Sequence, residues 1–169
     1  MSLRYVYGQD ETVRFVAQQI PHVDRGFPAD HLSIGITDAS GRMVAGVVYY
    51  FWNKKNGTIE IAAAALPGVR WFTRETIRRA LDFAFTQCRC QMVIMRVRGE
   101  DERLLYQLAR FGCSFVTLPR LYGRDTDGVM CLLTDDAYAA HPIVSRVNQR
   151  TPGSAAAAIS MVPFFLFQK

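Results

Sequence analysis

Several patterns that mark common classes of protein are missing from this 169-residue sequence. Its four cysteines, at positions 88, 90, 113 and 131, contain no CxxC pair and have no histidine at ligand spacing, so we expect no zinc or other metal site. No basic run exceeds two residues. Despite the net charge of +5, this scatter favours a solvated surface with a local anion site and makes nucleic-acid binding an unlikely role.

Targeting and membrane signals are missing as well. The N-terminus, MSLRYVYGQDE, has neither a basic region nor an apolar one, so we expect no signal peptide and a cytoplasmic location, where the thiols stay reduced. The apolar segment from Ala155 to Phe167 is shorter than the roughly 20 residues that a membrane helix needs, and Pro163 interrupts it. We therefore predict no membrane span.

Half of the residues are apolar, which is enough for one domain with a proper core. We expect this domain to occupy residues 1–136 and a C-terminal extension to occupy residues 137–169, with Thr151 to Ser154 as a linker. The apolar end of the extension would be a liability if exposed. It is therefore predicted to dock on its own domain or on another chain, either a second copy or a protein partner.

The first third of the chain predicts a strand, a helix and a hairpin. Leu3 to Tyr7 is a short strand, and Asp10 is a candidate cap for a helix that stops at Pro21. The following loop, His22 to Asp30, contains Arg25 and Phe27, which we place near a substrate cleft. Two apolar strands then flank a Ser-Gly turn, at Leu32 to Asp38 and Met43 to Trp52.

The centre of the chain combines a buried strand with a basic helix start. Thr58 to Leu66 is β-branched and then small, and lies between two turns. A helix is predicted from Arg74 to Gln87 with Thr73 as its N-cap. Arginines at 70, 74 and 78 crowd the first turns of this helix, where the free N–H groups and the dipole already attract anions. We therefore predict that a carboxylate or phosphate binds there.

The remaining pattern completes an α+β fold. A strand (Gln91 to Arg98), a helix (Glu102 to Phe111) and two closing strands (Phe115 to Leu118 and Val129 to Thr134) follow in order. The whole order is strand, helix, three strands, helix, strand, helix and two strands. It predicts a mixed, mostly antiparallel central sheet of about seven strands, with flanking helices and one βαβ crossover.

This order, with its basic strand-to-helix junction, resembles the GNAT family of acyl-CoA-dependent N-acetyltransferases, and most closely a branch common in phages and prophages. The stretches that carry the likeness are IGITDASGRMVAGVVYY at 34 to 50, TIEIAAAA at 58 to 65, RWFTRETIRRALDFAF at 70 to 85 and EDERLLYQLARFG at 100 to 112. The resemblance covers about residues 3 to 135. It implies that the central strand splays from its neighbour and that acetyl-CoA is the co-substrate.

The resemblance also implies which residues hold acetyl-CoA. Strand backbone would pair with pantetheine, the pyrophosphate would sit at the start of the next helix, and a helix-capping residue, Asp101, would help to fix the arm. The strand residues are Ala63, Ala64, Ala65 and Leu66, and those of the junction are Arg70, Trp71, Phe72, Thr73 and Arg74. Where the family has glycines this chain has Thr73 and Glu75, and Asp101 replaces an asparagine.

Direct acetyl transfer needs a base, and in many relatives a tyrosine protonates the departing thiolate. Glu60, placed mid-strand between two isoleucines, is the base candidate; the alternative is a glutamate on the solvated side of the strand. Leu108 stands where the family tyrosine is expected, so Tyr106 and Tyr122 are the candidates for the acid. His22 and His31 are weaker candidates, and we expect His141 on the surface.

Two functions therefore remain open. The first is an N-acetyltransferase that transfers acetyl from acetyl-CoA to a primary amine by direct attack. The second is a GNAT-like module that has lost catalysis and has a structural or binding role, for example within a phage particle or its assembly machinery. The replaced glycines, Leu108 and the apolar tail favour the second.

Overall fold

A computed structural model of the chain describes residues 3–20, 23 and 26–144. His22, Arg25 and the apolar end at 155–167 lie outside the described residues, and so does the predicted linker. Helices long and apolar enough to cross a membrane do not occur in the part of the chain that the structure describes.

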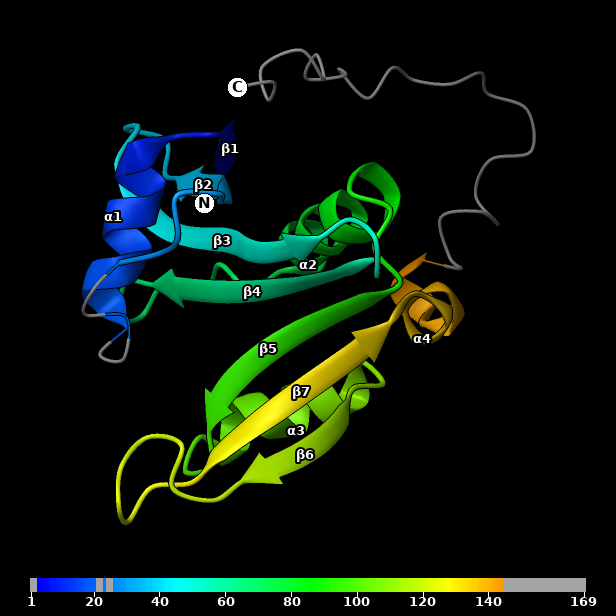
Figure 1. Cartoon of the computed structure of the whole chain (residues 1–169). Coiled ribbons are helices and arrows are strands. Elements are labelled where there is room, and N and C mark those ends of the chain that lie inside the picture. The colour runs from blue at the N-terminus through cyan, green and yellow to red at the C-terminus, as the bar shows by residue number, and fades with distance from the viewer. Residues whose placement is uncertain (1–2, 21–22, 24–25, 145–169) are drawn as a thin grey trace, which may run out of the picture.

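The described residues form one sheet of seven strands in the order β1-β2-β3-β4-β5-β7-β6 (Figure 1). Only β4 and β5 run parallel; the other neighbours are antiparallel, so the predicted fold class and the single βαβ crossover are confirmed. The strands are β1 (Arg4–Tyr7), β2 (Leu32–Thr37), β3 (Met43–Asn53), β4 (Thr58–Ala65), β5 (Met92–Arg98), β6 (Ser114–Leu118) and β7 (Gly128–Thr134).

Helices cover both faces of this sheet. On one face, α1 (Asp10–Gln19) packs its buried Val16 against alternate residues of β3 and β4, among them Val48 and Ala62. On the other, α2 (Arg74–Asp82) and α3 (Glu102–Arg110) bury Leu81 and Leu108 against Ile59 and its neighbours. In Figure 1, α2 and α3 lie behind the sheet. The strands β3 and β4 thus send alternate side chains into two different cores.

Three predicted helix starts have different outcomes. Thr73 and Asp101 cap α2 and α3 as expected, because their side chains accept hydrogen bonds from the N–H groups of Thr76 and Leu104. The prediction for Asp10 was wrong. Gln9 holds the N-cap position, and Asp10 is the first helical residue of α1, where its charge faces the positive end of the helix dipole.

Two helical segments were not predicted as such. The long helix expected up to Gln87 ends as an α-helix at Asp82 and continues as a π-helical turn, Phe83–Gln87, closed by the Cys88 N–H to Phe83 O bond of 2.9 Å. A fourth helix, α4 (Asp135–Ala140), spans the expected domain boundary at 136. Its Tyr138 is buried in the main core.

Candidate functional site

The central feature of the site is a separation of β4 from β5. The two strands pair only from Thr58 opposite Met92 to Ile61 opposite Met95. Beyond that pair β4 continues to Ala65, whereas β5 continues to Arg98 alongside β7. Figure 1 shows the two arrows diverging. The splay implied by the resemblance is therefore present.

Backbone groups on β4 face this opening at alternate residues. The Leu66 N–H donates to Val44 O at 2.9 Å, so the backbone of Leu66 points toward β3. Because antiparallel pairs alternate, Ala64 also turns its backbone toward β3, and Ala63 and Ala65 turn theirs toward β5. Of the four residues expected to offer backbone, Ala63 and Ala65 are placed to do so, whereas the Leu66 amide is already used.

An apolar cleft lies beside the opening, on the face covered by α2 and α3. Its walls are apolar and enclose about 80 Å³. Leu108, only 6% exposed, stands where the family tyrosine would be and forms part of a wall. The other lining residues that matter below are Ala63, Trp71, Phe72, Ile77, Met95 and Phe111. A narrow apolar cleft of this kind suits the apolar part of a long, flexible ligand.

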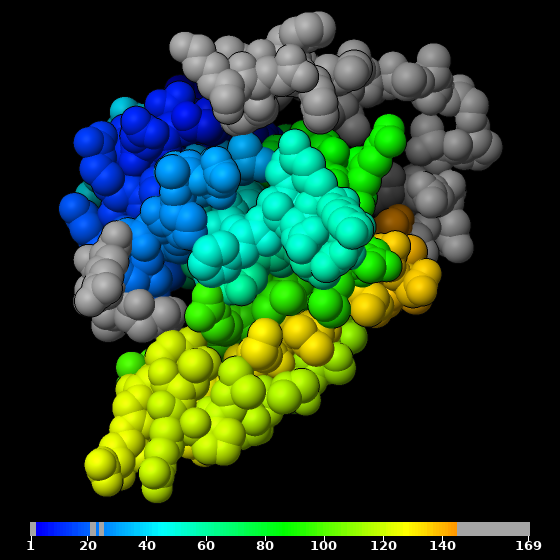
Figure 2. All heavy atoms as spheres, in the orientation of Figure 1, coloured from blue at the N-terminus to red at the C-terminus, as the bar shows by residue number. Residues whose placement is uncertain are grey.

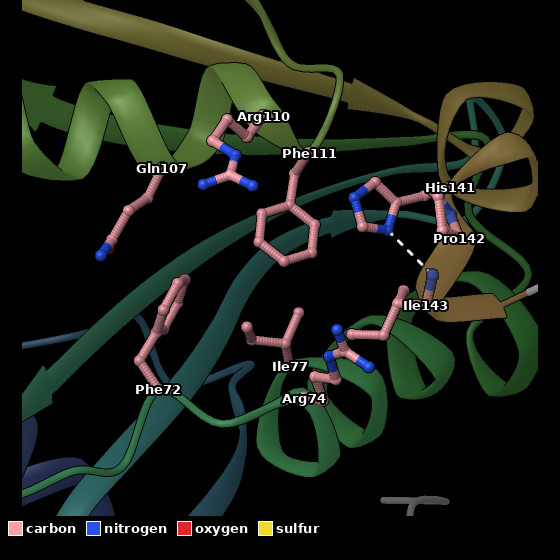
Figure 3. A pocket seen from close by; sticks show the side chains of 9 residues that line it. All are labelled: Phe72, Arg74, Ile77, Gln107, Arg110, Phe111, His141, Pro142 and Ile143. Carbon is pink, nitrogen blue, oxygen red and sulfur yellow. Dashed lines mark hydrogen bonds between the residues drawn. The ribbon is translucent and has the colours of Figure 1, made fainter. Parts of the chain in front are cut away.

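A larger cavity of about 380 Å³ continues this cleft outward between α2, α3 and the end of α4 (Figure 3). Phe72 and Phe111 line both spaces, and their ring centres are 6.3 Å apart. Arg74 from α2 and Arg110 from α3 contribute two cations to the walls of the outer cavity. The path therefore changes from apolar to cationic as it runs outward.

His141, which was expected on the surface, forms part of this outer wall. Its ring is half-buried and stacks on Phe111 with centres 4.6 Å apart, and its Nδ1 accepts a hydrogen bond from the Ile143 N–H (Figure 3). Sequence reasoning also missed Arg110. The two residues come from the ends of different helices, and only the packing of α3 against α4 brings them to one cavity.

At the start of α2, the predicted arginine cluster divides. Arg74 lines the cavity, Arg78 pairs with Asp82 at 4.0 Å, and Arg70 is exposed ahead of the helix. The amides of Arg74 and Glu75 precede the first intrahelical bond, from the Ile77 N–H to Thr73 O, and are therefore in the position that binds anions at helix starts.

Glu75, which stands where the family has a small residue, is drawn away from the helix start. Its carboxylate accepts two bonds from Arg79, one turn further on, from Nε at 3.1 Å and from Nη2 at 2.9 Å. Both side chains are about half exposed, so the pair adds little stability. It does, however, neutralise the one acidic charge in the first turn of α2.

The opposite face of the sheet carries a polar cluster at the same opening. Glu60 Oε2 accepts a hydrogen bond from Arg96 Nε at 2.9 Å and lies 2.7 Å from Arg96 Nη2 in an ion pair. It is thus an ion-paired carboxylate. Tyr50 lies opposite Glu60 on β3, and burial followed by the Glu60 charge raises the pKa of its hydroxyl.

Of the two tyrosine candidates, only Tyr122 approaches this cluster. Burial raises the pKa of Tyr122, while the charges of Arg96 and Arg98 act in the opposite direction. The Arg98 guanidinium carbon lies 5.7 Å from the centre of its ring. Tyr106 is 65% exposed on α3, which covers the other face.

Residues of the α1–β2 connection also reach the polar cluster. Phe27, which was predicted to lie near a substrate cleft, packs on Tyr50 with ring centres 5.1 Å apart. His31 instead shares a hydrogen bond of 2.7 Å between its Nδ1 and Pro28 O. Asp101 is exposed and caps α3, so its carboxylate is occupied with the Leu104 N–H.

The four cysteines are buried and free. A group of three or more histidine, cysteine, aspartate or glutamate side chains able to hold a metal ion does not occur among the described residues.

Comparisons with known proteins identify the fold. No family model and no curated protein sequence matches the chain. Among solved structures, mutant forms of the spermidine/spermine N-acetyltransferase SpeG from Vibrio cholerae are similar, with a TM-score of 0.66 and 17% identity over 81% of this chain and 97% of that chain. A dodecameric spermidine N-acetyltransferase from the same organism gives 0.68 and 16%, over 82% and 96%.

A third similar structure is that of the Vibrio cholerae enzyme in complex with manganese ions, with a TM-score of 0.65 and 15% identity over 88% of this chain and 97% of that chain. At such low identities the likeness establishes the fold alone. The chain has the fold of GNAT-type N-acetyltransferases.

Proposed function

We propose that this protein is an acyl-CoA-dependent N-acetyltransferase that transfers an acetyl group to a primary amine by direct attack. The observation that carries the proposal is the opening between β4 and β5, which joins an apolar cleft with a cationic outer end to a polar cluster on the opposite face. Acetyl-CoA, a thioester with a long polyanionic arm, needs such a path. The amine acceptor needs access from the opposite face, which carries the polar cluster.

The residues present fit acetyl-CoA. The backbone groups of Ala63 and Ala65 would pair with the amides of pantetheine, and the walls at Phe72 and Phe111 would cover its methylene groups. Arg74, Arg110 and the first amides of α2 would hold the phosphates. Because Arg79 neutralises Glu75, the missing glycine at 75 does not place an uncompensated negative charge there.

The co-substrate supplies an activated acetyl group; this chain's residues manage the protons. In this proposal Glu60 takes the amine proton as the amine nitrogen bonds to the acetyl carbon, because Arg96 engages Oε2 and leaves Oε1 as the acceptor. Tyr122, a neutral hydroxyl whose pKa burial raises further, gives a proton to sulfur as the carbon–sulfur bond breaks. Arg96 offers charge to the developing oxyanion.

Calorimetric titration with acetyl-CoA and with CoA tests the proposal. We expect saturable binding that weakens at least about tenfold in Arg74→Glu, because the substitution replaces a cation with an anion beside the phosphates. Arg14→Glu is the matched control, since Arg14 is an exposed arginine of α1 on the other face, and it should bind normally. The variant Arg70→Glu measures how much the exposed Arg70 contributes to the affinity for acetyl-CoA. Absence of binding by the unaltered protein would overturn the proposal.

The second candidate is a GNAT-like module without catalysis, and specific observations favour it. Thr73 and Glu75 occupy glycine positions, and Leu108 closes the place of the family tyrosine with an apolar wall. It predicts no binding of either ligand, together with loss of association when residues 152–169 are deleted. Membership of the phage branch and a place in a phage particle remain predictions of this second candidate.

A further inference from the structure

The outer cavity between α2, α3 and the end of α4 has a cation on each of two walls. Arg74 comes from α2 and Arg110 from α3, and both side chains are exposed. Neither forms an ion pair with another described residue, whereas Arg78 and Arg79, further along α2, both do. An anionic ligand would therefore not have to displace a carboxylate from Arg74 or Arg110.

The carboxylates of the three bordering helices do not line this cavity. Glu75 and Asp82 of α2 each pair with an arginine of the same helix. The cavity is lined by the last turns of α3 and by the residues after α4, whereas the acidic residues of these two helices lie at their starts. These acidic residues are Asp101, Glu102, Asp135 and Asp136. The cavity therefore favours a negatively charged ligand.

His141 adds a hydrogen-bond donor of fixed orientation. Its Nδ1 accepts the Ile143 N–H at 3.2 Å, so the neutral ring carries its proton on Nε2, which donates. The ring stacks on Phe111 with centres 4.6 Å and planes 22° apart. In Figure 3 the other ring nitrogen points away from Ile143, to the side where Phe111 and Arg110 lie. Arg110 and His141 can thus donate to one ligand group.

The size and the walls of the cavity suit a phosphorylated nucleotide. Its volume of about 380 Å³ lies within the usual range of small-molecule sites, roughly 300–1,000 Å³. Phe72, which is 36% exposed, and Phe111 offer aromatic rings on which a base can stack. CoA ends in such a nucleotide and has two separate phosphate groups, the pyrophosphate of the arm and the phosphate on the ribose.

The donors around the cavity also divide into two groups. Arg74 and the first amides of α2 lie on one side and suit the pyrophosphate. Arg110 and His141 come from α3 and from the end of α4, and they remain for the second phosphate. A phosphate monoester has a charge of about −1.5 to −2 at neutral pH, and a guanidinium binds such a group through two parallel hydrogen bonds.

We infer that Arg110 and His141 bind the 3′-phosphate of the CoA ribose, so that the protein selects CoA esters over dephospho-CoA esters. This inference rests on the proposed acetyltransferase function and names the part of the co-substrate that the outer cavity recognises.

CoA and dephospho-CoA differ only in this phosphate, so calorimetric titration with each ligand measures its contribution. We expect dephospho-CoA to bind at least about tenfold more weakly, the usual effect of hydrogen bonds to a charged group. Equal affinities would overturn the inference and leave the proposed function intact. A protein that binds neither ligand would overturn both.

Variants of Arg110 locate the effect. Arg110→Gln should weaken CoA binding about tenfold and leave dephospho-CoA binding unchanged, which removes the preference. Arg14→Gln is the matched control, because Arg14 is an exposed arginine of α1, which covers the other face of the sheet and forms part of the surface in Figure 2. It should keep the full preference. Equal losses of affinity for both ligands in Arg110→Gln would contradict the assignment of Arg110 to the ribose phosphate.

His141→Phe tests the second donor, because it keeps an aromatic ring against Phe111 and removes Nε2. We expect the preference for CoA to fall about three- to tenfold. Nuclear magnetic resonance of the unaltered protein gives the same test without a substitution. CoA should shift the Nε2–H resonance of His141 further than dephospho-CoA does, and equal shifts would show that His141 does not contact the ribose phosphate.

Discussion

At the scale of single residues, the buried cysteines link the core to pH. Cys88 and Cys113 are 8% exposed and Cys131 is fully buried. Burial raises the pKa of Cys88 and of Cys113 to about 12, and that of Cys131 to about 11. An ionised thiolate would lose its hydration in these positions, so the folded protein keeps these protons when the unfolded chain has released them.

This difference predicts that stability falls in alkaline solution. Above about pH 9 the unfolded chain binds fewer protons than the folded one, so the free energy of unfolding decreases as pH rises toward about 11. We expect a loss of at least about 1 kcal/mol per pH unit, since one such thiol contributes up to about 1.4 kcal/mol. Urea unfolding in reducing buffer measures this slope.

The variant Cys113→Ala tests whether the thiols cause the alkaline loss. It removes one of the titrating groups, so its stability should fall less steeply with pH than that of the unaltered protein. A steeper or unchanged slope would mean that other groups dominate.

The Glu75–Arg79 pair should affect the affinity for acetyl-CoA through its charge, without contact with the ligand. Arg79→Gln frees the Glu75 charge at the start of α2, and we expect acetyl-CoA affinity to fall about two- to fourfold, the usual size of helix-terminus effects. Glu75→Gln should raise affinity by a similar factor. Calorimetry at low salt measures both, and added salt should reduce both effects. Equal affinities in the two variants would exclude this electrostatic link.

At the scale of elements, much of the fold was predictable because local signals agreed with the final packing. The turn at Ser40 and Gly41, the cap at Thr73 and the glycine after α3 each place an element boundary within a few residues of its observed position. The π-helical turn after Asp82 was not predictable, because the sequence to Gln87 contains no helix-breaking residue. Its i to i+5 bonding is a consequence of packing.

The site was predictable only where one element supplies it. Glu60 was a candidate because of its place in a strand and Arg74 because of the basic helix start, whereas Ala63 and Tyr122 were candidates through the family resemblance. Arg96 was not, because its role depends on the parallel register that places β5 beside β4. The sequence signal for Arg96 was a charged residue that alternates with apolar ones in a strand. Glu60 has a similar position in the preceding strand, and this could have suggested that the two side chains pair.

The contact between α1 and the sheet predicts the effect of adding one methyl group. A Cβ at Gly46 would stand 2.7 Å from Val16 Cγ2 and 2.9 Å from Thr12 Cγ2, which is closer than carbon atoms pack. Gly46→Ala should therefore destabilise the protein by about 1–3 kcal/mol, the usual cost of overpacking.

The matched variant makes room for that methyl group. Val16→Ala alone should destabilise the protein, because it leaves a cavity. The double variant with Gly46→Ala should lose less stability than the sum of the losses in the two single variants. Urea unfolding of the four proteins gives the coupling energy. Additive losses would mean that α1 shifts freely and that the close approach is not a constraint.

At the scale of the whole molecule, α4 joins residues beyond the expected domain boundary at 136 to the core. Tyr138 is 5% exposed, its hydroxyl donates to Asp82 at 2.9 Å, and its ring stacks on Phe85 with centres 5.2 Å apart. These contacts tie α4 to the end of α2 and to the π-helical turn after it. His141 and Ile143, which follow α4, complete the outer cavity.

We therefore predict that a chain ending after residue 136 is less stable than one ending after residue 144. Loss of the buried Tyr138 side chain alone should cost about 3–5 kcal/mol, and Tyr138→Ala in the full chain should reproduce most of that loss. Tyr138→Phe separates packing from the Asp82 bond and should cost only about 1 kcal/mol. Thermal and urea unfolding of these four proteins and of the unaltered full chain would measure these differences. If the chain ending at 136 matched the one ending at 144 in stability and in acetyl-CoA affinity, α4 would be dispensable both to the core and to the cavity that it borders.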